Sequence, residues 1–77
     1  MLNGKTRELK KELKKHYDLW ASVNGKEFNV TMNDGQYIVQ ETFNDEVVTT
    51  DIYDNLTDAI TQYIKLYDNA ETLPLVG

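Results

Sequence analysis

The sequence predicts an α+β fold in which an N-terminal helix, three or four antiparallel strands and a C-terminal helix follow one another, with one face of the sheet covered. Three observations predict it. Apolar residues recur at helical spacing near both ends of the chain; turn-forming Asn-Gly, Asp-Gly and Asn-Asp pairs interrupt the middle; and apolar and polar residues alternate between those pairs. The chain has 77 residues, from which we expect one domain over residues 1–70 and a loose tail at 71–77.

The first element is expected to be a helix from about Lys5 to Tyr17. Leu9, Leu13 and Tyr17 recur every four residues and therefore share one face of such a helix. Most of the remaining surface is basic, through Lys10, Lys11, Lys14 and Lys15.

The segment 19–23 has two interpretations. Asn24-Gly25 is typical of a type I′ hairpin turn, which would make Leu19–Val23 a strand that pairs with Lys26–Met32. Gly25 could instead cap a longer first helix, with Trp20 on its buried face. The Asn-Gly pair favours the hairpin.

Asp34-Gly35 and Asn44-Asp45 divide the middle into strands at about 27–32, 36–43 and 46–53. Two-residue turns would pair Val30 with Val39, and Val39 with Thr50. Because side chains alternate along a strand, these registers predict one apolar and one mixed polar face. The predicted apolar face consists of Phe28, Val30, Met32, Tyr37, Val39, Phe43, Val48 and Ile52. The predicted polar face consists of Glu27, Asn29, Thr31, Ile38, Gln40, Thr42, Val47, Thr49, Asp51 and Tyr53.

The last element is expected to be a helix from about Leu56 to Asp68, with Asn55 as its N-cap. Its apolar stripe should cover the sheet, and consists of Leu56, Ala59, Ile60, Tyr63 and Tyr67. Pro74 ends any continuation, so the tail Ala70–Gly77 is expected to be loose.

Charge is distributed unevenly along the chain. The formal net charge is −5, yet residues 1–26 carry seven Lys/Arg and three Asp/Glu, whereas residues 27–77 carry one lysine and ten Asp/Glu. The absence of cysteine excludes disulfides, thiol catalysis and thiolate metal sites. With no signal-peptide pattern at the start and no run of membrane-spanning length, the expected location is cytoplasmic.

The residues that could perform catalysis or bind metal are few. His16 is the only histidine and lies in the lysine-rich helix, and the single serine, Ser22, has no nucleophile-elbow context. Asp51, Asp54 and Asp58 form the densest acidic cluster, but their spacing is not that of a calcium loop. We therefore expect a protein that is not an enzyme and has no metal or cofactor.

Two surfaces remain as candidates for binding. The basic helix could contact nucleic-acid phosphates through Lys10, Lys11, Lys14 and Lys15, although Glu8 and Glu12 interrupt it. The uncovered sheet face and the acidic body could instead bind a protein, since Trp and Tyr on a polar surface often anchor interfaces. The candidate residues for protein binding are Trp20, Glu27, Asp45, Glu46, Asp51 and Tyr53.

The segment Met32–Val39, the acidic hairpin after it and the helix start at Tyr53–Ile60 together resemble small acidic phage-encoded inhibitors of the anti-CRISPR kind. The resemblance implies an inhibitor that presents carboxylates where a nucleic-acid-binding target expects phosphates, acting in the cytoplasm of a bacterial cell. The leading hypothesis is thus a non-enzymatic protein-binding protein. The alternatives are nucleic-acid binding through the first helix, and self-assembly into homo-oligomers.

Overall fold

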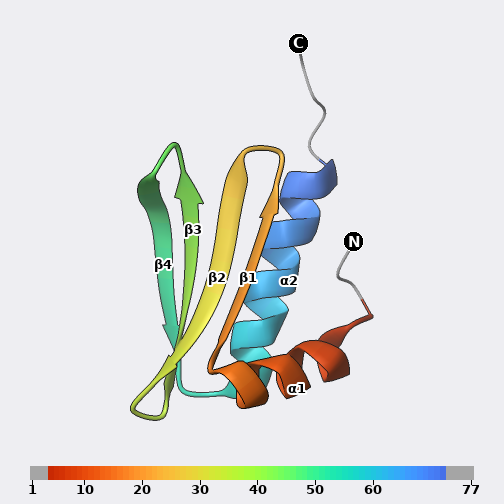
Figure 1. Ribbon diagram of the computed structural model, residues 1–77, viewed down its shortest axis with the longest axis vertical. Coiled ribbons are helices and arrows are strands. Elements are labelled where there is room, and N and C mark those ends of the chain that lie inside the picture. Colours follow the sequence, from red (N-terminus) through yellow and green to blue (C-terminus); the bar gives the residue numbers. More distant parts are fainter. Residues whose placement is uncertain (1–3, 73–77) are drawn as a thin grey trace.

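Residues 4–72, which the computed structural model describes, form two helices and one sheet. The elements are α1 (Thr6–His16), β1 (Asp18–Val23), β2 (Lys26–Asn33), β3 (Gln36–Phe43), β4 (Glu46–Tyr53) and α2 (Leu56–Thr72). All neighbouring strands are antiparallel, in the order β1-β2-β3-β4 (Figure 1). This order confirms the predicted α+β fold with four strands.

Helix α1 ends at His16 because Tyr17 adopts a left-handed conformation with φ 64°. The Tyr17 N–H donates to the carbonyl of Leu13 over 2.8 Å, which closes the last turn of the helix. Strand β1 begins at the next residue. Segment 19–23 is therefore a strand, as the Asn-Gly turn indicated, and the longer first helix is wrong. Leu19 is buried on one side of β1, and Trp20 lies on the other side.

All three hairpins turn through two residues with positive φ. The angles are 52° and 81° at Asn24-Gly25, 50° and 78° at Asp34-Gly35, and 53° and 64° at Asn44-Asp45. Positive φ at both central residues is the type I′ geometry, whose twist matches that of the flanking strands. Asn, Asp and Gly tolerate it best, which is why these pairs were readable as turns.

Strand β4 contains a β-bulge that the sequence did not reveal. Next to the turn Thr42 opposes Val47, but Glu41 opposes Thr49, so Val48 is an extra residue. One extra residue exchanges the two faces of the remaining strand. The prediction that Val48 and Ile52 belong to the covered face is wrong, because both are at least half exposed. Tyr53 instead packs against the core.

Helix α2 begins where Asn55 Oδ1 accepts the Asp58 N–H over 3.1 Å, which confirms the predicted N-cap. It continues to Thr72, one turn further than expected. Ala70 is buried, and its carbonyl accepts the side-chain N–H of Asn24 over 2.9 Å. The expectation of a loose tail is thus wrong for residues 70–72, and positions 73–77 lie outside the described residues.

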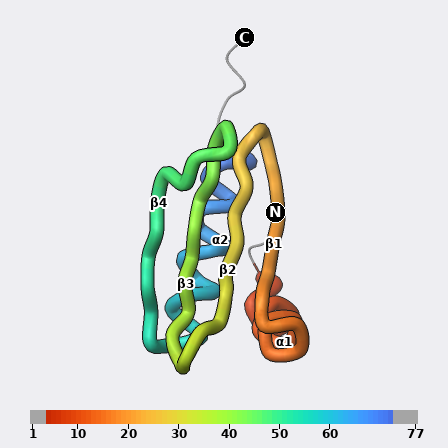
Figure 2. The backbone as a smooth tube through the Cα atoms, turned by 60° about the vertical axis from the view of Figure 1, so that its left-hand side comes forward, coloured from red at the N-terminus to blue at the C-terminus, as the bar shows by residue number. Residues whose placement is uncertain are grey.

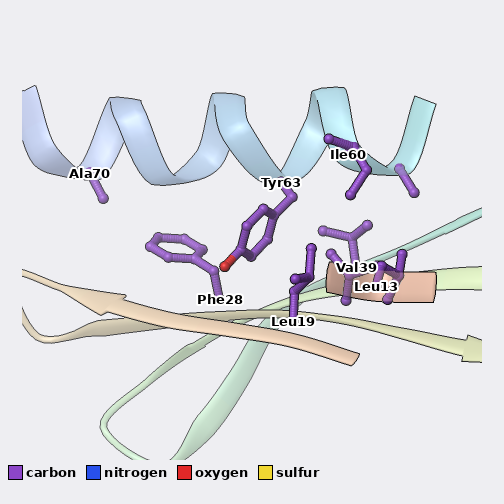
Figure 3. Packing of buried hydrophobic residues seen from close by; sticks show 9 residues of the cluster. Leu13, Leu19, Phe28, Val39, Ile60, Tyr63 and Ala70 are labelled. Atoms are coloured by element: carbon purple, nitrogen blue, oxygen red, sulfur yellow. The ribbon is translucent and has the colours of Figure 1, made fainter. Parts of the chain in front are cut away.

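The core lies between α2 and one face of the sheet, and α1 closes the end where α2 begins (Figures 1 and 3). Its buried members come from both helices and the first three strands: Leu13, Leu19, Phe28, Val30, Val39, Ala59, Ile60, Tyr63 and Ala70. Phe28 meets Tyr67 edge to face, with ring centroids 6.2 Å apart. Figure 2 views the molecule from the side that α2 does not cover, where the strands stand in front of the helix.

Neither helix of the described residues has the length and apolar character that crossing a membrane requires.

Shortening Ile52 tests the bulge. Since Ile52 is 58% exposed and Ile60 is fully buried, we expect Ile60→Ala to cost about 2–5 kcal/mol of unfolding free energy and Ile52→Ala less than about 1 kcal/mol. Urea denaturation measures both. Equal losses would mean that Ile52 is a core residue and that β4 has the unbulged register.

Because of Tyr63, the free energy of unfolding should depend on pH in the alkaline range. Burial, with a smaller contribution from Tyr67, raises the pKa of Tyr63 to about 12. The folded state then keeps its phenol neutral while the unfolded state ionises above about pH 10, so the free energy of unfolding should fall between pH 10 and 12 by at most about 1.4 kcal/mol per pH unit. Denaturation between pH 9 and 12 measures the slope. Tyr63→Phe should lessen it, and an unchanged slope in that variant would assign the effect to other groups.

Candidate functional site

The four strands present one uncovered face, here called the open face. The cross-strand pairs align its residues in rows that run from β1 to β4. Its members are Asp18, Trp20, Ser22, Glu27, Asn29, Thr31, Asn33, Gln36, Ile38, Gln40, Thr42, Val47, Thr50 and Ile52.

Large apolar side chains stand on the open face among polar ones. Trp20 is 63% exposed, Ile52 is 58% exposed and Val47 is 54% exposed. Trp20 comes from the edge strand β1, whereas Val47 and Ile52 come from the opposite edge strand β4. The polar row of Asn29, Gln40 and Thr50 crosses the sheet between them. The face therefore combines separated apolar anchors with hydrogen-bonding groups.

A shallow depression of about 270 Å³ lies beside Trp20, lined by Trp20, Glu27, Phe28, Asn29, Gln40 and Thr42. The ring of Phe28 belongs to the core, so the polar groups of the depression come from its other members. The side-chain amide of Gln40 donates to Thr50 Oγ1 over 3.4 Å, which leaves the Gln40 carbonyl oxygen as an acceptor.

The charges of the sheet are almost all negative. Residues 18–54 carry eight Asp/Glu and one lysine, Lys26. Lys26 pairs with Glu41 across 3.6 Å, and both project from the covered side of the sheet. The charged members of the open face are Asp18 and Glu27, both acidic. The charged side chains that a partner meets on this face are therefore acidic.

The structure separates the six residues that the sequence proposed for protein binding. Trp20 and Glu27 lie together at the depression. Asp45 and Glu46 are exposed at the tip of the β3–β4 hairpin.

Asp51 and Tyr53 do not belong to the open face, and their assignment to it is wrong because the bulge turns them toward α2. Asp51 accepts a hydrogen bond from Gln62 of α2 over 3.4 Å. Burial, then the charges of Asp51 and Asp58, raises the pKa of Tyr53.

The residues considered for catalysis or metal binding are dispersed. His16 is exposed and lies 3.4 Å from Glu12, one turn earlier in α1. Asp54 accepts from Gln36 at 3.5 Å, whereas Asp51 contacts Gln62. Between residues 4 and 72, no group of three or more His, Asp or Glu side chains is arranged to hold a metal ion.

The basic side chains of α1 lie apart from the acidic face. Helix α1 packs against α2 and β1 through Leu13, on the covered side of the sheet. Lys11, Lys14 and Lys15 are exposed, and Lys10 is half-buried. The charge asymmetry of the sequence is therefore a spatial separation as well.

Sequence reasoning did not single out Asn29, Gln40 and Thr42. It placed all three on the polar face but did not connect them with Trp20. The sequence nevertheless contains this relation, because the Asn24-Gly25 and Asp34-Gly35 turns fix the registers that align Trp20, Asn29 and Gln40 in one row across the sheet.

The fluorescence of Trp20 reports on the open face, since it is the only tryptophan of the chain. We expect acrylamide to quench the native protein nearly as strongly as the protein in denaturant, because the indole is 63% exposed. Relative to N-acetyl-tryptophanamide at equal ionic strength, quenching by caesium should be enhanced and quenching by iodide reduced, because the surrounding charge is negative. Enhanced iodide quenching relative to that model compound would contradict this charge distribution.

Comparison with protein-family models, with curated proteins and with solved structures found no match to this chain. The chemistry of its own surfaces is therefore the guide to its function.

Proposed function

We propose that this chain is a non-enzymatic protein-binding domain whose open face engages a basic surface of a partner protein. One observation carries the proposal: an uncovered four-stranded sheet face exposes Trp20 beside Glu27, and all of its charged members are acidic.

The composition of the open face suits a protein partner. Tryptophan is a frequent interface anchor because its large rigid ring buries much area while losing little conformational entropy. The amides and hydroxyls around it can satisfy polar groups of a partner. A polar surface with a few aromatic and aliphatic anchors is typical of non-obligate interfaces, whose cores are depleted in charge.

The size of the open face indicates how much of a protein–protein interface it can supply. Three strands of eight residues and one of six cover at most roughly 26 by 19 Å, or about 500 Å² in projection. Specific interfaces bury about 800 Å² per partner. A planar area understates the accessible surface of the side chains that stand on it, so the open face can supply much of such an interface, and the exposed acidic tip at Asp45 and Glu46 lies at its end.

Charge complementarity favours a basic partner. Eight acidic residues and one lysine in the sheet region would attract a positively charged surface and steer its approach. Surfaces that bind nucleic-acid phosphates are of this kind. Together with the resemblance to phage-encoded inhibitors, this supports an inhibitor that occupies the nucleic-acid site of its target.

A pair of matched substitutions tests the proposal. Thr50→Arg places a cation on the open face, and Thr61→Arg makes the same change at an exposed position of α2. Tagged wild-type protein and both variants would be used to recover partners from the host lysate. Binding to the isolated partner would then be measured by calorimetry. We expect Thr50→Arg to weaken binding at least about tenfold and Thr61→Arg to leave it within about twofold.

Equal binding by Thr50→Arg and the wild type would show that the open face is not the interface. The acidic contribution has its own test, the double variant Asp45→Lys with Glu46→Lys. It should bind more weakly, with the difference shrinking as salt increases, and unchanged binding would remove the acidic tip from the interface.

A further inference from the structure

We infer that the depression beside Trp20 is a subsite for one arginine side chain of the partner, with the guanidinium stacked on the indole and paired with Glu27. This inference rests on the proposed function and specifies the chemistry by which the partner is held. The juxtaposition that carries it is an exposed aromatic ring, a carboxylate and neutral acceptors around one small hollow.

The lining groups match the needs of a cation. Trp20 supplies an indole, the aromatic side chain that attracts cations most strongly, and Glu27 supplies the opposite charge. Within residues 4–72 no cation pairs with Glu27, since Lys26, its neighbour in sequence, pairs with Glu41 on the opposite side of the sheet. The carboxylate is therefore available to a partner.

The remaining lining groups favour arginine over lysine. Oxygen acceptors are present on Asn29, Gln40 and Thr42, and the Gln40 oxygen is left open by the hydrogen bond from its amide to Thr50. A guanidinium carries five donors in one plane, so it can stack on an indole and donate at its edges simultaneously. The compact ammonium of lysine lacks this planar surface.

The open shape of the depression favours a side chain over a separate small molecule. Cavities that take drug-sized ligands measure about 300–1,000 Å³ and enclose most of the ligand. This depression is about 270 Å³ and open to solvent on the sheet face, so it encloses less of an occupant than such cavities do. It has room for one long side chain whose backbone remains outside, as expected for an anchor residue of a protein partner.

The experiment uses a probe that needs no partner. N-acetyl-arginine amide, whose only charge is its guanidinium, is titrated into the isotope-labelled full chain at constant ionic strength. Two-dimensional NMR follows the indole N–H of Trp20 and the side-chain amides of Asn29 and Gln40. We expect saturable shifts centred on these groups, with a Kd on the order of 1 mM, as suits a fragment of this size. The neutral citrulline analogue should bind at least about tenfold more weakly.

Glu27→Gln and Glu46→Gln form the matched pair of variants, because each removes one exposed carboxylate and only Glu27 lines the depression. Glu27→Gln should weaken arginine binding about tenfold, whereas Glu46→Gln should change it less than about twofold. Equal binding of citrulline, equal effects of the two variants, or shifts that spread without saturation over all acidic residues would each overturn the inference.

The arginine titration can succeed or fail independently of the partner-binding test of the proposed function. Loss of partner binding in Thr50→Arg without arginine binding at Trp20 would leave the proposed function standing and remove this subsite. Arginine binding at Trp20, with a partner that binds Thr50→Arg as tightly as wild type, would instead remove the open face as the interface and overturn the assignment of the subsite to that partner.

Discussion

The packing of α2 across one face of the sheet is the contact on which the rest of the structure depends. The buried residues of α2, with Leu13 of α1, meet Leu19, Phe28, Val30 and Val39 of the strands. A chain of this length buries only about 60% of the surface its unfolded form exposes, so its apolar residues supply one core and no second one. The other face of the sheet therefore stays open to solvent, and side chains on it are free of the packing constraints that govern the core.

Much of this arrangement follows from local chemistry that a sequence displays. Asn-Gly, Asp-Gly and Asn-Asp pairs tolerate the positive φ of type I′ turns, and Asn55 can cap a helix, so element order, turns and helix starts were predictable. The same turns correctly placed Trp20 and Glu27 on the open face. The extension of α2 to Thr72 was not predictable, since it depends on the burial of Ala70 beside the first hairpin, a contact between distant segments.

The bulge at Val48 shows why the candidate site was only partly predictable. Alternation assigns every residue of a strand to a face once one pair is known, so a single extra residue inverts everything beyond it. That inversion takes Asp51 and Tyr53 from the open face and exposes Ile52 there. In the native structure this inversion packs Tyr53 against the core and lets Asp51 accept a hydrogen bond from Gln62. No local pattern in residues 46–53 indicates either of these contacts.

The side-chain amide of Asn24 binds the carbonyl of Ala70, and at the other end of β1 the Met32 N–H donates to the carbonyl of Tyr17 over 3.1 Å. The turn of the hairpin that carries Trp20 and Glu27 is thus fastened to α2, and the pairing of its two strands continues as far as Tyr17, where α1 ends. A recognition surface mounted in this way has little freedom left to lose when it meets another molecule, so a larger share of its contact energy becomes affinity. Asn24 has no proposed role in binding, yet its hydrogen bond to Ala70 helps to hold in place the hairpin that carries Trp20.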